Sequence, residues 1–118
     1  PYFFSSRQGG LLALAGLWED WSMEDRYLRS FSILTTDANA LMRPVHDRMP
    51  VVVPPEAWER WLDSEVQRPD ELADLLAPAE PKTLRKCRVG SFVNKVGNDG
   101  QECVREVPEA GEQGRLPF

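Results

Sequence analysis

The sequence contains only one histidine and two cysteines, and these small numbers exclude several kinds of site. Zinc sites need cysteines and histidines at close spacing, whereas Cys87 and Cys103 stand far from each other and from His46. Two cysteines are also too few for the disulfide framework of a small secreted protein. The sequence has no glycine-rich phosphate loop and no Gly-x-Ser-x-Gly motif. We therefore predict reduced thiols, and no metal or cofactor.

Long apolar runs are lacking as well. The longest apolar segment without a charge is GGLLALAGLW, about half the length that a membrane-crossing helix needs. No basic segment precedes an apolar one near the start, as a secretory signal would require. The sequence predicts a cytoplasmic protein without a membrane partner. It begins at Pro1 without a methionine, which suggests a truncated chain.

An excess of positive charge is also missing, because the 118 residues carry a formal net charge of −5. This balance argues against a nucleic-acid partner, since affinity for phosphate comes mostly from lysine and arginine. Residues 82–96, however, contain basic side chains and no acid: Lys82, Arg85, Lys86, Arg88 and Lys95. A basic face on an acidic protein therefore remains open.

The hydrophobic patterns predict an α+β fold with mixed, mostly antiparallel strands and short amphipathic helices. Strands are expected at residues 1–4, 11–18, 29–36, 49–53 and 87–96. Helices are expected at residues 37–42, 54–63 and 68–78. The composition fits one domain, which we place at residues 1–107. Residues 108–118 have too few apolar side chains to pack and are expected to form a disordered tail.

Three of these elements carry specific expectations. The polar segment SSRQGG predicts a hairpin between strands 1–4 and 11–18. Because both faces of segment 11–18 are apolar, it should be a central strand covered on both sides. Thr36 is expected to cap the helix at 37–42.

Three charged side chains are candidates for chemistry, and each has an alternative. Glu19 follows Trp18 at the end of the apolar strand, where desolvation can favour acid and base catalysis, or it is simply solvated. His46 can move protons near neutral pH or serve as a hydrogen-bonded structural residue. Arg48 can hold a phosphate or pair with Asp47, Glu19 or another carboxylate. The helical spacing of Trp58 and Trp61 favours core packing over a base-stacking surface.

Four segments in order, ALAGLWEDW, FSILTTDAN, PVHDRMPVVVPPEAWERWLD and RVGSFVNKVGNDG, closely resemble the SOS response-associated peptidase (SRAP) family. The similarity runs from about residue 3 to about residue 107. It is most specific around Trp18 and Glu19 and at residues 46–50, which match active-site motifs of the family. NKVGNDG departs from the usual family segment, which is closer to NNVRNDG.

The resemblance implies a protein that processes abasic sites in single-stranded DNA. In the family, an N-terminal cysteine attacks the ring-opened sugar and forms a thiazolidine crosslink, and an associated autopeptidase activity exposes that cysteine. Glu19 would then assist proton transfer and autocleavage, and His46 would promote opening of the sugar ring and reversal. The resemblance also implies that Arg48, Asn94 and Lys95 contact the DNA.

The family's nucleophilic cysteine has no counterpart here, because neither cysteine of this sequence carries a free α-amine. The chain resembles the C-terminal half of the family domain, so that this fragment alone should be inactive. Three hypotheses follow: part of a covalent abasic-site enzyme, a nucleophile-less module that binds single-stranded DNA, or an inactive remnant that docks on a partner. A half-domain also leaves apolar strands without neighbours, which predicts marginal stability for the isolated chain.

The final residues, QGRLPF, have the spacing Gln-x-x-Leu-x-Phe. This pattern resembles the short C-terminal motifs with which bacterial repair proteins bind the replication sliding clamp. Gln113 would form a hydrogen bond at the rim of the clamp pocket, and Leu116 and Phe118 would fill it. Patterns this loose also arise by chance, and Pro117 is not typical of the motif.

Overall fold

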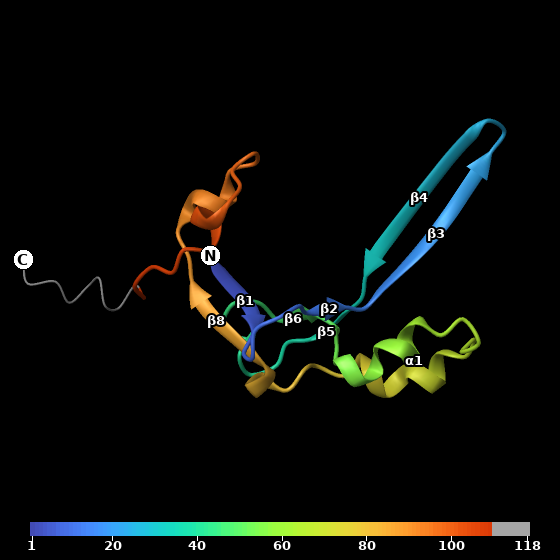
Figure 1. Ribbon diagram of the computed structural model, residues 1–118, viewed down its shortest axis with the longest axis horizontal. Coiled ribbons are helices and arrows are strands. Elements are labelled where there is room, and N and C mark those ends of the chain that lie inside the picture. Colours follow the sequence, from blue (N-terminus) through green and yellow to red (C-terminus); the bar gives the residue numbers. More distant parts are fainter. Residues whose placement is uncertain (110–118) are drawn as a thin grey trace, which may run out of the picture.

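The computed structural model describes residues 1–109 and confirms the α+β class (Figure 1). Every strand pair is antiparallel, and the helices are short. No helix within residues 1–109 is long and apolar enough to cross a membrane. The strands are β1 (Tyr2–Ser6), β2 (Ala13–Leu14), β3 (Gly16–Met23), β4 (Arg26–Ile33), β5 (Thr35–Asp37), β6 (Arg48–Pro50), β7 (Val52–Val53) and β8 (Leu84–Arg88). The helices are α1 (Trp58–Leu62) and the 3₁₀ helices η1 (Pro55–Ala57), η2 (Pro69–Leu76), η3 (Pro81–Thr83), η4 (Ser91–Asn94) and η5 (Gln101–Val104).

Three extended segments exchange partners at one buried point, where Ala15, Leu34 and Val51 meet. The N–H of Ala15 donates to the carbonyl of Val51 at 2.8 Å, and that of Val51 donates to the carbonyl of Leu34 at 2.9 Å. The N–H of Leu34 closes the ring on the carbonyl of Ala15 at 2.9 Å. Each of these residues lies between two strands, so three arms leave this junction: β2 with β7, β3 with β4, and β5 with β6.

The hydrophobic core lies at this three-way junction and is small. Ala15 and Val51 are almost completely buried, and the partly exposed Trp61, from α1, packs against the cluster to which they belong. The helical segment begins at Pro55, whose fixed φ suits a first helical turn, and Glu56 places an acid where the helix dipole favours one. The other members of this cluster are Val53, Ala57 and Leu75, with Leu34 and Leu72 packed against it, and Ala38, Met49, Leu84 and Val89 are buried outside it.

The described chain is elongated. Its radius of gyration is 18.4 Å, whereas a compact domain of this length has roughly 13–14 Å. The β3–β4 hairpin projects away from the rest of the molecule, and β1 with β8 lies on the opposite side of the junction (Figure 1). As a result, many large apolar side chains are exposed, among them Leu11, Leu17 and Phe31.

The predicted hairpin between residues 1–4 and 11–18 is wrong. Strand β1 pairs with β8 over its whole length, and β2 pairs with β7. The turn does form at Gly9 and Gly10, both at positive φ, but it leads the chain to the junction instead of back along β1. Segment 11–18 divides at Ala15 and is not covered on both sides, since Leu11 is 87% and Trp18 66% exposed.

Two further predictions need correction. Residues 37–42 form no helix: Thr36 lies in β5, and the turn at residues 40–45 is held by the Asn39 side chain, which accepts from the N–H of Met42 at 2.9 Å. The predicted strand at 87–96 ends at Arg88, and residues 91–94 form η4. The predicted strands at 29–36 and 49–53 are extended but divide at Leu34 and Val51, as segment 11–18 does at Ala15. The predicted helices at 54–63 and 68–78 are present, the first as η1 with α1 and the second as the 3₁₀ helix η2.

Candidate functional site

The lone histidine is oriented by its own backbone neighbour. Nδ1 of His46 accepts the N–H of Arg48 at 3.0 Å, which requires that nitrogen to be unprotonated and leaves Nε2 as the protonated position of a neutral ring. A carboxylate oxygen of Asp47 lies 3.2 Å from the same Nδ1 and would favour a proton there. The two contacts therefore favour opposite protonation states. Because the His46 side chain is 66% exposed, its Nε2 edge can reach a ligand.

Arg48 is fixed to strand β5. Its Nη1 donates to the Asp37 carboxylate at 2.8 Å, and its Nη2 lies 3.0 Å from the Thr35 carbonyl and 3.2 Å from the Thr35 hydroxyl. Arg48 and Asp37 are direct partners in the β5–β6 register. Of the alternatives that the sequence left open, the structure shows an ion pair with another carboxylate, Asp37. The guanidinium has five N–H donors and is 47% exposed, so it retains capacity for a phosphate.

Glu19 lies on a different arm of the junction. It stands in the middle of β3 opposite Ser30, and its side chain is exposed, so the desolvation considered from the sequence is absent. No hydrogen bond or ion pair among residues 1–109 joins it to His46 or Arg48. Roughly 13 Å of strand separates Glu19 from Ala15, and roughly 10 Å separates Arg48 from Val51. The junction therefore sets how the segment with Glu19 is placed relative to residues 46–48, without bringing the two into contact.

The face of the hairpin opposite Glu19 carries a network that the sequence did not reveal. The Arg29 guanidinium binds Asp20 through two bonds of 2.6 and 2.9 Å and lies 4.7 Å from the centre of the Trp18 ring. This contact lowers the pKa of the Asp20 carboxyl, and a hydrogen bond to Asp20 raises the pKa of Tyr27. Asp20 and Arg29 lie opposite each other because of the register of β3 and β4. That register depends on the type of turn between the two strands, which the sequence did not predict.

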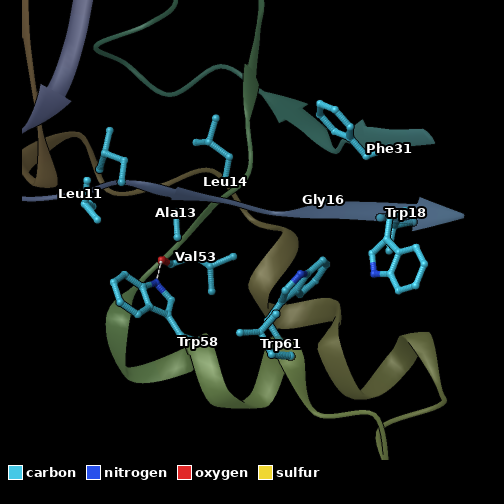
Figure 2. Close-up of a pocket in the computed structure, with 12 residues that line it drawn as sticks. Leu11, Ala13, Leu14, Gly16, Trp18, Phe31, Val53, Trp58 and Trp61 are labelled. Atoms are coloured by element: carbon cyan, nitrogen blue, oxygen red, sulfur yellow. Dashed lines mark hydrogen bonds between the residues drawn. The ribbon is translucent and has the colours of Figure 1, made fainter. Parts of the chain in front are cut away.

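Trp18 and Phe31, from the same face, also line an apolar groove of about 530 Å³ (Figure 2). Its other wall comes from α1, where Trp58 and Trp61 approach β2 and β7. The Trp58 indole N–H is held by the Val53 carbonyl at 2.8 Å. The prediction that Trp58 and Trp61 are core residues is correct for Trp61, which packs against the core, whereas Trp58 is 36% exposed.

The last two predicted DNA contacts, Asn94 and Lys95, lie away from the motif at residues 46–50. Asn94 is the final residue of η4, and Lys95 follows it, in the part of the chain beyond β8 (Figure 1). Within residues 1–109 no hydrogen bond links either side chain to His46 or Arg48. Cys87 and Cys103 form no disulfide within residues 1–109. The proposed clamp-binding residues Gln113, Leu116 and Phe118 lie outside the described residues.

Comparison with known proteins identifies relatives for most of the chain. The family model described as SOS response associated peptidase (SRAP) matches residues 1–96. The abasic site processing protein YoaM of Bacillus subtilis is 35% identical over 105 residues, which cover 88% of this chain and 46% of that protein. The abasic site processing protein HMCES of Gallus gallus is 35% identical over 97 residues, covering 80% of this chain and 28% of that protein.

A solved structure shows the same arrangement of elements. A protein from Bacteroides thetaiotaomicron superposes with a TM-score of 0.80 at 27% identity, over 92% of this chain and 48% of that one. The bacterial relatives likewise match over slightly less than half of their own length. The chain therefore spans about half the length of these bacterial relatives.

Proposed function

Because the chain belongs to the SRAP family, we propose that it forms part of a protein that processes abasic sites in single-stranded DNA. Its relatives carry the name abasic site processing protein. The observation that contributes most is the geometry of residues 46–48, where one short segment holds both an exposed imidazole of fixed orientation and an exposed guanidinium. Residues 1–107 then correspond to the C-terminal half of a family domain.

The proposed chemistry needs a cysteine with a free α-amine, which a segment not contained in this sequence would supply. The amine condenses with the aldehyde of the ring-opened sugar and releases water, leaving a Schiff base. The thiol then adds across that C=N bond: sulfur bonds to carbon, the proton passes to nitrogen, and a thiazolidine closes. The associated autopeptidase activity would expose the cysteine.

The residues of this chain would manage protons and hold the strand. Glu19 transfers protons at the amine and the sugar and assists autocleavage, and His46 promotes opening of the sugar ring and reversal of the adduct. Arg48 binds a backbone phosphate, with Asn94 and Lys95 as further contacts to the DNA. The β3–β4 arm thus contributes Glu19, the β5–β6 arm contributes Arg48 with His46 just before it, and the DNA strand would lie between these two arms.

The test uses a completed domain, defined as this chain joined to the part of YoaM that it does not match and beginning with cysteine. Incubated with a single-stranded oligonucleotide that contains one abasic site, the completed domain should give an adduct that survives denaturing electrophoresis. Changing the first cysteine to serine should abolish it, and this chain alone should give none. An adduct formed by this chain alone would overturn the assignment of the nucleophile. DNA binding by the completed domain without any adduct would instead favour a nucleophile-less binding module.

Arg48→Glu in the completed domain should weaken binding to undamaged single strands. Loss of one phosphate contact makes the slope of log affinity against log salt shallower by about 0.7. Fluorescence anisotropy across a salt series measures both quantities. Arg48→Lys keeps the charge but not the forked donor geometry, so it should preserve most of the slope. An unchanged salt slope in Arg48→Glu would remove this residue from the DNA contacts and leave it as the partner of Asp37.

A contact with the replication sliding clamp is a second proposal on partners. It depends on the spacing of Gln113, Leu116 and Phe118 in the sequence. A fluorescent peptide of residues 108–118 should bind the clamp, and Leu116→Ala with Phe118→Ala should abolish this binding. Absence of binding at high micromolar clamp would disprove the contact.

A further inference from the structure

A second pocket, of about 480 Å³, is lined by four cationic residues. Its apolar lining consists of Leu41, Pro81 and Leu84. The acid-free segment 82–96 predicted a basic face, and the structure places part of that segment here. The pocket also includes Arg7, which is distant in the sequence and which no sequence pattern had indicated. The cations are Arg7, Lys82, Arg85 and Lys86.

The pairing of β1 with β8 gathers these residues. Ser5 lies opposite Arg85, and the N–H of Arg7 donates to the Thr83 carbonyl at 3.1 Å, which extends the strand contact beyond Ser6. The short helix η3 then places Lys82 next to this end of the pair. Two chain segments that are about 75 positions apart in the sequence therefore contribute charge of one sign to one pocket.

Internal ion pairing neutralises these cations only in part. Lys82 lies 3.2 Å from Glu80, and Arg85 lies 3.7 Å from a carboxylate oxygen of Glu106. All four of these side chains are more than half exposed, so the pairs are weak and can be displaced. The Arg7 guanidinium has no ion-pair partner among residues 1–109. The pocket keeps a surplus of positive charge on a chain whose net charge is −5.

The pocket is joined to the candidate site. Nζ of Lys86 donates to the Leu41 carbonyl at 3.2 Å, and Leu41 belongs to the turn at residues 40–45 that leads directly to His46. No aromatic side chain of the described residues lines the pocket, so it offers no surface on which a base could stack. Its chemistry suits phosphate and sugar.

From this arrangement we infer that the pocket formed by Arg7, Lys82, Arg85 and Lys86 binds backbone phosphates of the single-stranded DNA to one side of the abasic site. The inference rests on the proposed function for the identity of the strand. The pocket supplies affinity without base preference, because phosphate contacts carry no sequence information. It would anchor the strand beyond the segment that reaches His46 and Arg48.

The test compares a double variant, Lys82→Gln with Arg85→Gln, with a matched control. The control, Arg26→Gln with Arg68→Gln, also removes two positive charges, one at the tip of the β3–β4 hairpin and one at the residue before η2. Binding of undamaged single-stranded DNA is measured by anisotropy over a salt series, for the 118-residue chain and for the completed domain. The pocket variant should bind about 5- to 10-fold more weakly at low salt, with a salt slope shallower by about 1.4. The control should match the parent protein.

Arg7→Gln provides an independent check, since Arg7 lies in the turn after β1 and its side chain makes no ion pair within residues 1–109. It should make the slope shallower by about 0.7 without lowering thermal stability. Equal slopes in the parent, the double variant and Arg7→Gln would overturn the inference. Covalent capture of abasic DNA distinguishes the inference about the pocket from the proposed function. If no protein captures abasic DNA but the differences in salt slope remain, the proposed function is wrong, whereas the inference that the pocket binds DNA is supported.

Discussion

Glu19→Gln in the completed domain is expected to lower the rate of adduct formation by about 10²- to 10⁴-fold, the usual contribution of a general acid or base. Glutamine keeps the shape of the side chain but cannot accept and return the proton that imine formation requires. The side chain is exposed on β3 and makes no ion pair within residues 1–109, so its replacement removes no structural contact. Single-turnover capture of abasic DNA, followed by denaturing electrophoresis, gives the rate.

Glu24→Gln is the matched control for this change. Glu24 lies on the same hairpin, in the turn between β3 and β4, where it has a positive φ of 54°. Its replacement removes the same charge from the same arm of the molecule, so any general electrostatic effect on DNA binding is shared. Equal rates in the two variants would show that Glu19 takes no part in proton transfer. The peptidase role makes a parallel demand: in a completed domain extended by a few residues before the cysteine, Glu19→Gln should leave those residues uncleaved.

The parts of the fold that could be predicted from the sequence depend on local information. Two prolines before an amphipathic stretch predict the helical segment at 55–62, and β-branched residues predict the extended segment 49–53. Strand partners depend on non-local contacts instead. The turn at Gly9 and Gly10 is correct, yet the exchange of partners at Ala15, Leu34 and Val51 cannot be derived from it. A hydrophobic strand that changes partner in its middle has the same pattern as a continuous one.

The part of the candidate site that comes from a single sequence motif could be predicted. His46 and Arg48 lie two positions apart, so their proximity follows from the sequence, and the structure adds the bond from the Arg48 N–H to Nδ1. Asp37 as the partner of Arg48 was not predicted, because residues 37–42 had been assigned to a helix. The placement of Glu19 on a separate arm was equally invisible, since it depends on the direction in which the hairpin leaves the junction.

His46→Ala in the completed domain should slow opening of the sugar ring and reversal of the adduct by about 10²-fold or more, with a smaller effect on DNA affinity. Nε2 can accept a proton from the sugar only in the tautomer that carries the ring proton on Nδ1, which the Asp47 carboxylate favours and the contact with the Arg48 N–H opposes. Reversal is followed by release of labelled DNA from the purified adduct. The variant should release the labelled DNA at least about 10²-fold more slowly than the parent protein.

Asp47→Asn separates the imidazole from its carboxylate neighbour. The Asp47 side chain is 91% exposed, so its 3.2 Å contact with Nδ1 should contribute little in water. The variant keeps both the ring and the hydrogen bond from the Arg48 N–H, so its reversal rate should stay close to that of the parent protein. If Asp47→Asn slows reversal as strongly as His46→Ala, the carboxylate is the proton-transfer group. If His46→Ala releases the DNA at the rate of the parent protein, the histidine acts only as the residue that fixes the backbone of residues 46–48.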